Sequence, residues 1–440
     1  MCNIQLITIA AIISLIAGDD LLLLQAIWRH GDRAPIGSCK GCPIQQEHWP
    51  QGLGQLTVQG MIQQVKLGKI IYNRYVNSLK FLSSYYDPRQ IYVRSTDVNR
   101  TLISAMANFI GFYNNPSQNE RIGIDFPNIT EWPQGFIPVP IHTVVKNTDY
   151  VGIPDTYCPR QKWLMKLVQQ TPEWKNLVKK YTGVLEELES ICKQSLSFND
   201  VPRCVDTFYC EKLYAFRIPV SDYQYDQLRQ LSYAIQNYEN GLNLQPYDGI
   251  DFKHEIGKIR GGSIFWSILN HFDLKLYCLK PENYENSHCT WMNNLKYYAY
   301  SAHDTTLAAL MCTLDAKHKI LSDGGYPKYT AAMFFELWNT TNGPGLKVYY
   351  HRNFTATQLE NITNLLDHCS ENMDSNGFCD YSKFRTHGIA YYPGNINKLC
   401  QDIKSKRTSF NPDEHETKAI PIITVSPAVL TLLLSQVLIF

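Results

Sequence analysis

Residues 21–28 form a run that is apolar except for Gln25. A strand that is covered by helices on both faces of a sheet has this pattern. The run leads directly into a short segment rich in charge: Arg29, His30, Gly31, Asp32, Arg33, Ala34 and Pro35. Polar side chains directly after a buried strand predict a binding site at the carboxyl edge of a parallel sheet.

The same order of strand, polar loop and helix recurs along the chain. Apolar residues at helical spacing predict helices through residues 61–75, 102–110, 251–276 and 306–314. Strands are predicted at residues 91–93, 296–301, 333–338 and 346–350. This alternation predicts an α/β fold with an open, mostly parallel sheet flanked by helices.

The middle of the chain has a different character. Residues 113–156 are rich in Pro, Asn and Gly and predict long ordered loops, whereas residues 160–240 have mainly helical patterns. We therefore expect an α/β core of about residues 19–126 and 248–405, into which a smaller α-helical domain of about residues 127–247 is inserted.

Both ends of the chain predict export. Residues 4–17 are apolar and precede small and acidic residues, which predicts a signal peptide over residues 1–18. The alternative is a buried first strand. Residues 406–418 form a polar stalk, and residues 419–440 contain no charge and are long enough to span a bilayer. We expect this tail to be a membrane anchor, either a single-pass span or a removable signal for a lipid anchor. The alternative is a buried C-terminal helix.

The cysteines and the glycosylation sequons also predict that the chain enters the secretory pathway and that its α/β core is extracellular or lumenal. Thirteen cysteines are many for a cytosolic enzyme, and beyond Cys39 and Cys42 no second Cys-x-x-Cys pair completes a zinc site. Asn-x-Ser/Thr sequons occur at Asn99 and at four positions where we predict glycosylation: Asn128, Asn339, Asn353 and Asn361.

The overall charge limits the choice of ligand. The chain has 41 Lys and Arg against 40 Asp and Glu, so no global field attracts nucleic acid. Affinity for an anion must therefore come from a local cluster of arginines.

Three segments supply such a cluster at the ends of predicted strands. Arg29, Arg33 and Arg94 offer forked donors that match phosphate oxygens, and Gly31 lets the backbone approach an anion. Among these cations the pKa of His30 should lie below its usual value of about 6.5, which leaves a neutral nucleophile that can form a phosphohistidine. The alternative for Arg94 is an ion pair with Asp97.

The segment after the predicted strand at 296–301 supplies the proton. A bound phosphate dianion should raise the pKa of Asp304, so that the carboxyl can protonate the leaving alkoxide and then activate water. His303 is a further donor to the phosphoryl oxygens. The scheme requires no metal and no cofactor. Taken singly, each of these residues is more often an ordinary surface feature, and only their joint placement predicts a site.

These motifs together resemble the histidine acid phosphatase family of the prostatic and lysosomal type. The family signature Arg-His-Gly-x-Arg-x-Pro is met by residues 29–35, and further matches occur at residues 49–57, 92–97 and 300–306. They follow the family's order, and the resemblance covers about residues 21–400.

The resemblance implies that His30 is the nucleophile and Asp304 the proton donor, with Arg29, Arg33, Arg94 and His303 binding the phosphoryl group. It also implies an α/β domain with a smaller helical insertion, phosphomonoester substrates, activity at acid pH and possible homodimers.

The resemblance bears on the cysteines as well. It implies the bridges Cys158–Cys400 and Cys369–Cys379. The expected partner position of Cys210 holds no cysteine, so we expect Cys210 to pair with Cys192 or Cys204. Local pairs are expected between Cys39 and Cys42 and between Cys278 and Cys289, and Cys312 is expected to be a buried free thiol.

Two alternative functions are compatible with the sequence. One is a phosphatase of narrower specificity, either phytase-like or acting on lysophosphatidate. The other is a catalytically inactive surface protein that binds phosphorylated ligands through the arginines.

Overall fold

The computed structural model describes residues 19–113, 121–133 and 135–403. Its centre is an 8-stranded sheet in the order β3-β2-β4-β1-β5-β6-β7, with β8 paired to β6. The strands are β1 (Asp20–Arg29), β2 (Ile91–Thr96), β3 (His142–Val144), β4 (Tyr297–Ala302), β5 (Ala332–Thr340), β6 (Gly343–His351), β7 (Glu360–Asn361) and β8 (Cys379–Asp380). The predicted signal peptide (residues 1–18), polar stalk (406–418) and membrane anchor (419–440) lie outside the described residues.

The strand β1 lies between the two halves of the sheet. It pairs in parallel with β4, which is parallel to β2, and it pairs antiparallel with β5. Leu23 and Ile27 pack into the core on one face, and Leu24 and Trp28 pack into the core on the other. This double burial explains the apolar run of β1, and the α/β class is as predicted.

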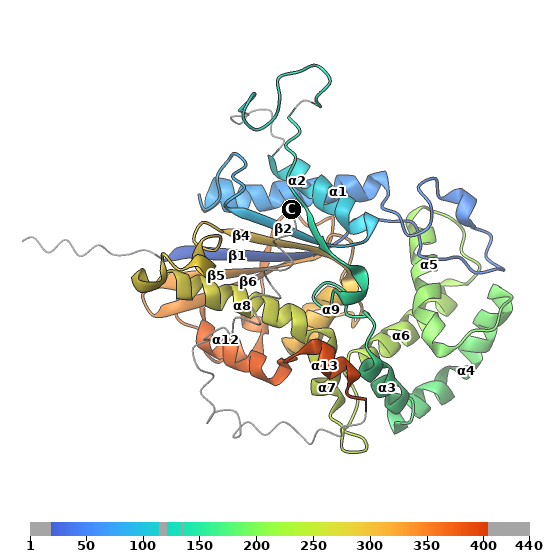
Figure 1. Cartoon of the computed structure of the whole chain (residues 1–440). Helices are drawn as coiled ribbons and strands as arrows, with labels where there is room; N and C mark the ends of the chain where they lie inside the picture. Colours follow the sequence, from blue (N-terminus) through green and yellow to red (C-terminus); the bar gives the residue numbers. More distant parts are fainter. Residues whose placement is uncertain (1–18, 114–120, 134, 404–440) are drawn as a thin grey trace, which may run out of the picture.

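Helices cover both faces of the sheet (Figure 1). The helices α1 (Val58–Tyr72) and α2 (Asn99–Tyr113) pack on one face. On the other face lie α8 (Gly262–Cys278), α9 (Asp304–Thr313) and α12 (Tyr381–Gly388).

The single helix predicted at residues 251–276 is wrong. The chain instead forms α7 (Phe252–Arg260) and α8, with a break at Gly261. A Cβ on Gly261 would lie 2.4 Å from the carbonyl oxygen of Ala309. The close approach of α9 therefore requires glycine here, and apolar periodicity alone does not reveal it.

A second group of helices packs around its own hydrophobic cluster at one end of the sheet (Figure 1). These are α3 (Pro159–Val168), α4 (Pro172–Cys192), α5 (Val201–Leu213) and α6 (Asp222–Glu239). The cluster contains Leu164, Leu188, Phe208 and Leu231, all buried. The helical character of this stretch is as predicted.

The described residues contain four disulfides: Cys39–Cys42, Cys158–Cys400, Cys278–Cys289 and Cys369–Cys379. Cys312 is a buried free thiol, as expected. The predicted pairing of Cys210 with Cys192 or Cys204 is wrong, because all three are free thiols. The sulfur of Cys210 instead lies 3.3 Å from the hydroxyl oxygen of Tyr329.

Candidate active site

Two segments that follow strands meet at one edge of the sheet. One is residues 29–35, which we call the nucleophile segment because His30 is the predicted nucleophile, and the other contains His303 and Asp304. The backbone N–H of His30 donates to the carbonyl oxygen of Ala302 at 3.2 Å. Ala302 ends β4, His303 caps α9, and Asp304 is the first residue of that helix. Parallel pairing of β1 with β4 thus brings together two segments that lie more than 270 residues apart in the chain.

The ring of His30 is held in one tautomer. Its Nδ1 lies 2.7 Å from the carbonyl oxygen of Gly31, and a carbonyl can only accept, so Nδ1 carries the proton. The lone pair is therefore on Nε2. Burial first, and then the charges of Arg100, Arg29 and Arg33, hold the pKa of His30 well below its usual value. The ring is a neutral base with a defined nucleophilic atom.

Gly31 has a packing role. A Cβ on Gly31 would lie 2.2 Å from the carbonyl oxygen of Gly60 near the start of α1. We predicted that Gly31 lets the backbone approach an anion. The structure gives a different reason for the glycine, which is the contact between the nucleophile segment and α1.

Three arginines surround the two histidines. Arg29 and Arg33 come from the nucleophile segment, and Arg100 comes from the first turn of α2. The Nε atoms of all three are buried and have no hydrogen-bond partner within the described part of the chain. Burial and the charges of Arg33 and Arg29 lower the pKa of Arg100 to about 10. Buried, mutually repelling guanidinium groups with unused donors are suited to binding an anion.

Arg94, which we predicted for this cluster, lies elsewhere. Its Nη2 pairs with the Oδ1 of Asp149 at 2.5 Å, and not with Asp97. Arg94 lines a small cavity with Asp149 and Tyr300. It is not among the main charges that lower the pKa of His30 or of His303. In its place the structure brings Arg100, which the sequence analysis missed.

His303 links the arginines to β2. Its Nδ1 lies 3.4 Å from an Nη2 of Arg100, which can only donate, so Nδ1 accepts. The Nε2–H then donates to the hydroxyl of Thr96 at 3.0 Å. Burial and the charges of Arg100 and Arg33 lower the pKa of His303, which is therefore neutral. The centroids of the two histidine rings are 5.8 Å apart.

Asp304 lies beside the nucleophile segment. Its Oδ2 pairs with the Nη2 of Arg29 at 2.9 Å. The other oxygen, Oδ1, accepts from the backbone N–H of Thr305 at 2.8 Å. The guanidinium group of Arg29 therefore belongs to the arginine cluster and also pairs with the carboxylate that is expected to supply a proton.

Two residues of the helical part, by which we mean the region of α3 to α6, hold side chains of the nucleophile segment in place. Asp206 on α5 accepts from both Nη atoms of Arg33, at 3.0 and 2.9 Å. Asp32 accepts from the hydroxyls of Thr57 at 2.6 Å and Tyr214 at 2.5 Å. Asp206 and Tyr214 were not expected from sequence, because nothing in a helical pattern indicates which residue reaches a distant sheet edge.

Comparison with known proteins agrees with this geometry. Residues 20–351 match the family model of the histidine phosphatase superfamily (branch 2). The chain belongs to this family. As a histidine phosphatase it is a phosphoric monoester hydrolase, the enzyme class that the sequence predicts.

Several characterised proteins are similar to this histidine phosphatase. Human prostatic acid phosphatase is 32% identical over 361 residues, which cover 81% of this chain and 83% of that protein. Human lysosomal acid phosphatase is 30% identical over 357 residues, covering 78% and 76%. Hafnia alvei phytase in its apo form has a TM-score of 0.59 at 16% identity, covering 87% of this chain and 98% of that chain. The last comparison shows a shared fold alone.

Proposed function

We propose that the chain is an acid phosphatase that transfers the phosphoryl group of phosphate monoesters to Nε2 of His30 and then to water. The observation that carries this proposal is the tautomer of His30. Its proton is held on Nδ1 by the carbonyl of Gly31, so that the unprotonated Nε2 belongs to the same site as three arginines whose Nε atoms are buried. Such a ring is a nucleophile and not an acid.

The arginines stabilise the transferring group. Arg29, Arg33 and Arg100 are available to neutralise the equatorial oxygens. The single N–H of His303 is donated to Thr96, so its proposed donation to the phosphoryl group requires that this hydrogen bond be exchanged when substrate binds. We propose Arg100, in place of Arg94, as the third phosphate-binding arginine. Since Arg33 is already held by Asp206 in bidentate geometry, little side-chain entropy is lost when phosphate binds.

Asp304 is the proposed proton donor. In the structure its carboxylate is paired with Arg29. A phosphate dianion would compete for that guanidinium and bring negative charge close to Asp304, and both effects favour the protonated carboxyl. The carboxyl then protonates the leaving alkoxide, and the resulting carboxylate activates water against the phosphohistidine.

Replacement of His30 tests the nucleophile. We expect His30→Ala to abolish turnover of p-nitrophenyl phosphate at acid pH. Rapid quenching of the wild type during turnover should trap an acid-labile phosphate on His30. His142→Ala is the matched control, since its exposed ring stacks on Tyr92 at the edge of the sheet. Trapped phosphate on a serine, aspartate or cysteine would contradict the mechanism.

The leaving-group dependence tests Asp304. We expect Asp304→Asn to slow esters of alkyl alcohols roughly 10²–10⁴-fold, the usual contribution of general acid catalysis. Esters with acidic leaving groups, such as p-nitrophenol, need little protonation and should lose far less. The ratio of kcat/KM for the two substrate types measures this, and equal losses would show that Asp304 is not the proton donor.

We further propose that residues 127–247 form a cap domain that sets substrate preference over the core of residues 19–126 and 248–405. Asp206 and Tyr214 support this assignment, because these cap residues contact Arg33 and Asp32. The narrower alternatives, phytase-like or lysophosphatidate phosphatase, differ in what this cap admits. A panel of monoesters assayed with one preparation separates them.

We also propose export, glycosylation and membrane attachment. Four disulfides support an oxidising compartment. Asn128, Asn339 and Asn361 are exposed and Asn353 is partly exposed, as glycan acceptors must be. Within residues 19–113, 121–133 and 135–403 no helix has the length and apolar character to cross a membrane. Phospholipase release from intact membranes tests whether the proposed anchor at residues 419–440 is a lipid anchor or a membrane span.

We also propose a homodimer, and sedimentation of the secreted chain measures its mass.

A further inference from the structure

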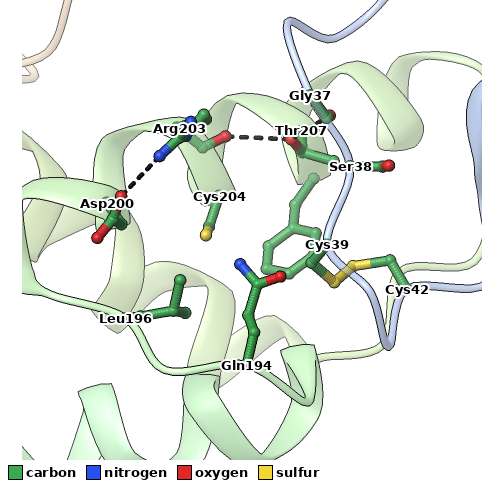
Figure 2. A pocket seen from close by; sticks show the side chains of 11 residues that line it. Gly37, Ser38, Cys39, Cys42, Gln194, Leu196, Asp200, Arg203, Cys204 and Thr207 are labelled. Atoms are coloured by element: carbon green, nitrogen blue, oxygen red, sulfur yellow. Dashed lines mark hydrogen bonds and ion pairs between the residues drawn. A yellow bond between two sulfur atoms is a disulfide. The ribbon is translucent and has the colours of Figure 1, made fainter.

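Four cysteines gather where the loop after the nucleophile segment meets the helical part. The loop carries the Cys39–Cys42 disulfide, α4 ends at Cys192, and Cys204 lies on α5. All four are at most 8% exposed. A cavity of about 130 Å³ lies beside them, lined among others by Cys39, Cys42 and Cys204 (Figure 2).

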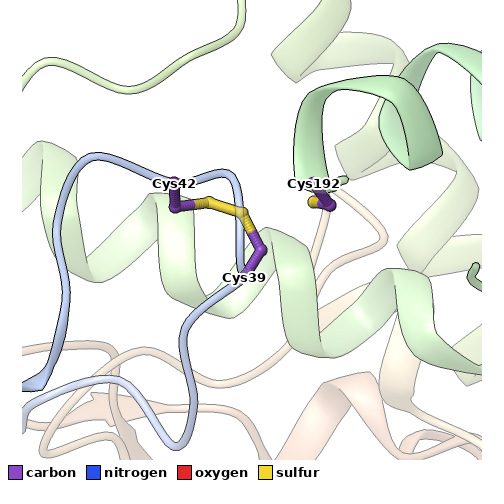
Figure 3. A group of neighbouring side chains, drawn as sticks. All are labelled: Cys39, Cys42 and Cys192. Carbon is purple, nitrogen blue, oxygen red and sulfur yellow. A yellow bond between two sulfur atoms is a disulfide. The ribbon is translucent and has the colours of Figure 1, made fainter. Parts of the chain in front are cut away.

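The disulfide is held against the thiol of Cys192. The sulfur atoms of Cys39, Cys42 and Cys192 all lie within 4.8 Å of one another (Figure 3). The backbone N–H of Gly41, between the two loop cysteines, donates to the carbonyl oxygen of Cys192 at 2.9 Å. A Cβ on Gly41 would lie 2.1 Å from the carbonyl oxygen of Ile191, so the loop rests directly on the end of α4.

Cys204 provides a proton acceptor for Cys192. The two side chains are hydrogen-bonded, and this bond lowers the pKa of the Cys204 thiol and raises that of Cys192. The pair can therefore lose one proton more readily than an isolated buried thiol and share the remaining one. Because these shifts favour the proton on Cys192, the Cys204 thiolate acts as the base that takes this proton up, which gives a thiolate on Cys192 at the moment when its sulfur attacks the neighbouring disulfide.

We propose that Cys39, Cys42, Cys192 and Cys204 form a thiol–disulfide exchange site. The thiolate of Cys192 attacks one sulfur of the Cys39–Cys42 bond, a new bond to Cys192 forms, and the other sulfur leaves as a thiolate. The leaving thiolate takes up the proton released by the Cys192–Cys204 pair. One disulfide is broken and one is made, so the step needs no oxidant or reductant.

Exchange changes what the disulfide ties together. In the starting form it closes a loop with a sequence separation of 3. In the product it joins the loop to the end of α4, and a longer closed loop restricts the unfolded chain more. The loop that carries Cys39 also lies close to the active site. The hydroxyl of Thr207 on α5 donates to the carbonyl oxygen of Gly37 in this loop at 2.9 Å, and the residue before Thr207 is Asp206, which holds Arg33. The inference does not depend on the phosphatase mechanism.

Disulfide mapping of the secreted full-length chain tests the site. The native protein is incubated without reductant, quenched in acid, denatured, alkylated with N-ethylmaleimide and digested with trypsin. Lys40 lies between Cys39 and Cys42, and Lys193 follows Cys192, so trypsin places these three cysteines on separate peptides. We expect a fraction of Cys192 linked to Cys39 or Cys42, with the displaced cysteine alkylated in equal amount.

Three other results would overturn the proposal. One is a Cys39–Cys42 bond in all molecules with Cys192 and Cys204 fully alkylated. Another is a complete Cys192–Cys204 disulfide, which leaves no attacking thiol. The third is one equivalent of zinc on four reduced cysteines, measured by elemental analysis of the untreated protein.

A trapping variant gives a second measurement. Cys42→Ser leaves Cys39 unpaired beside Cys192, and we expect the secreted variant to contain a Cys39–Cys192 bond. In the double variant Cys42→Ser, Cys192→Ser this bond should be lost completely and Cys39 alkylated. Cys312→Ser, a buried thiol on α9, should leave the wild-type map unchanged. Alkylated Cys39 in the single variant would contradict the exchange geometry.

Discussion

Burial and three guanidinium groups act on His30 in the same direction. A histidine in water is largely a cation below about pH 6.5 and cannot attack phosphorus. In this site, burial lowers the pKa of His30 most, and Arg100 contributes more than Arg29 or Arg33. The arginines that we propose to bind phosphate thus also keep the proposed nucleophile unprotonated in acid.

The titration of His30 should respond to Arg100. We expect Arg100→Met to raise the pKa of His30, because the largest of the positive charges acting on it is removed, and the acid limb of kcat/KM should move to higher pH. Proton NMR of the ring Cε1–H, assigned by its loss in His30→Ala, measures the pKa directly. Arg203→Met is the control, since Arg203 is 62% exposed on α5 and pairs with Asp200. Equal titration of both variants would show that burial alone sets the pKa.

Arg94 and Arg100 show what sequence can and cannot specify at this scale. Both follow the apolar core of β2. The rule that ligands bind beyond strand ends favoured Arg94, and the resemblance to the acid phosphatases was interpreted in the same way. Arg94, however, is still within β2, where side chains alternate between faces, and its side chain is directed toward Asp149. Arg100 reaches the site because the first turn of α2 lies beyond the strand end. The resemblance to acid phosphatases located His30, Arg33 and Asp304 through contiguous motifs, but tertiary partners such as Asp206 have no local signal.

At the scale of elements, α1 supports the nucleophile segment. Thr57 caps α1 by accepting from the N–H of Gly60, and its hydroxyl donates to the carboxylate of Asp32. Gly31 and Gly60 allow the segment and the helix to approach within contact of their backbones. Most positions of the main strands and helices were predictable from periodicity, although the order of the strands in the sheet was not predicted. This contact instead depends on two glycines that lie about 30 residues apart in the chain.

Gly60→Ala tests this contact. The added Cβ would lie 2.2 Å from the carbonyl oxygen of Asp32, so the helix or the nucleophile segment must shift. We expect a loss of about 1–3 kcal/mol in the free energy of unfolding, typical of overpacking, together with reduced kcat. Gly183→Ala on the exposed face of α4 meets no atom within 4 Å and should instead stabilise by about 0.5–1 kcal/mol. Urea unfolding of both variants measures this, and a neutral Gly60→Ala would contradict the packing role.

For the whole molecule, several neutral histidines that are buried or partly buried lower the stability of the folded chain in acid. Burial lowers the pKa of His30 and His303, and it lowers the pKa of His271 and of His368 to about 3. In the unfolded chain these rings bind protons near pH 6.5, while in the folded chain they do not. The unfolded state therefore gains protons as the pH falls from 6.5 toward 3, and stability is lost over that range.

His271→Gln isolates part of this cost. The ring of His271 contacts the amide oxygen of Gln25 at 2.9 Å, a contact that a glutamine amide can replace. At pH 4.5 the wild-type ring costs about 3 kcal/mol, from about 1.4 kcal/mol for each of the two pH units between 6.5 and 4.5. We expect the variant to lose less stability than wild type between pH 7 and pH 4.5, measured by urea unfolding at both values. His48→Gln, at an exposed position, should follow wild type, and parallel curves for all three proteins would contradict the argument.

The bidentate pair between Arg33 and Asp206 has a consequence for how such an enzyme can diverge. The loops and surface of the helical part can change during evolution, and new substrates can be admitted, while the sheet stays the same. Most residues of the helical part do not contact the nucleophile segment. Asp206 is an exception, since it orients a guanidinium group of the nucleophile segment. A transplanted cap that lacks a carboxylate at this position would therefore bring new specificity to an enzyme with a misaligned arginine.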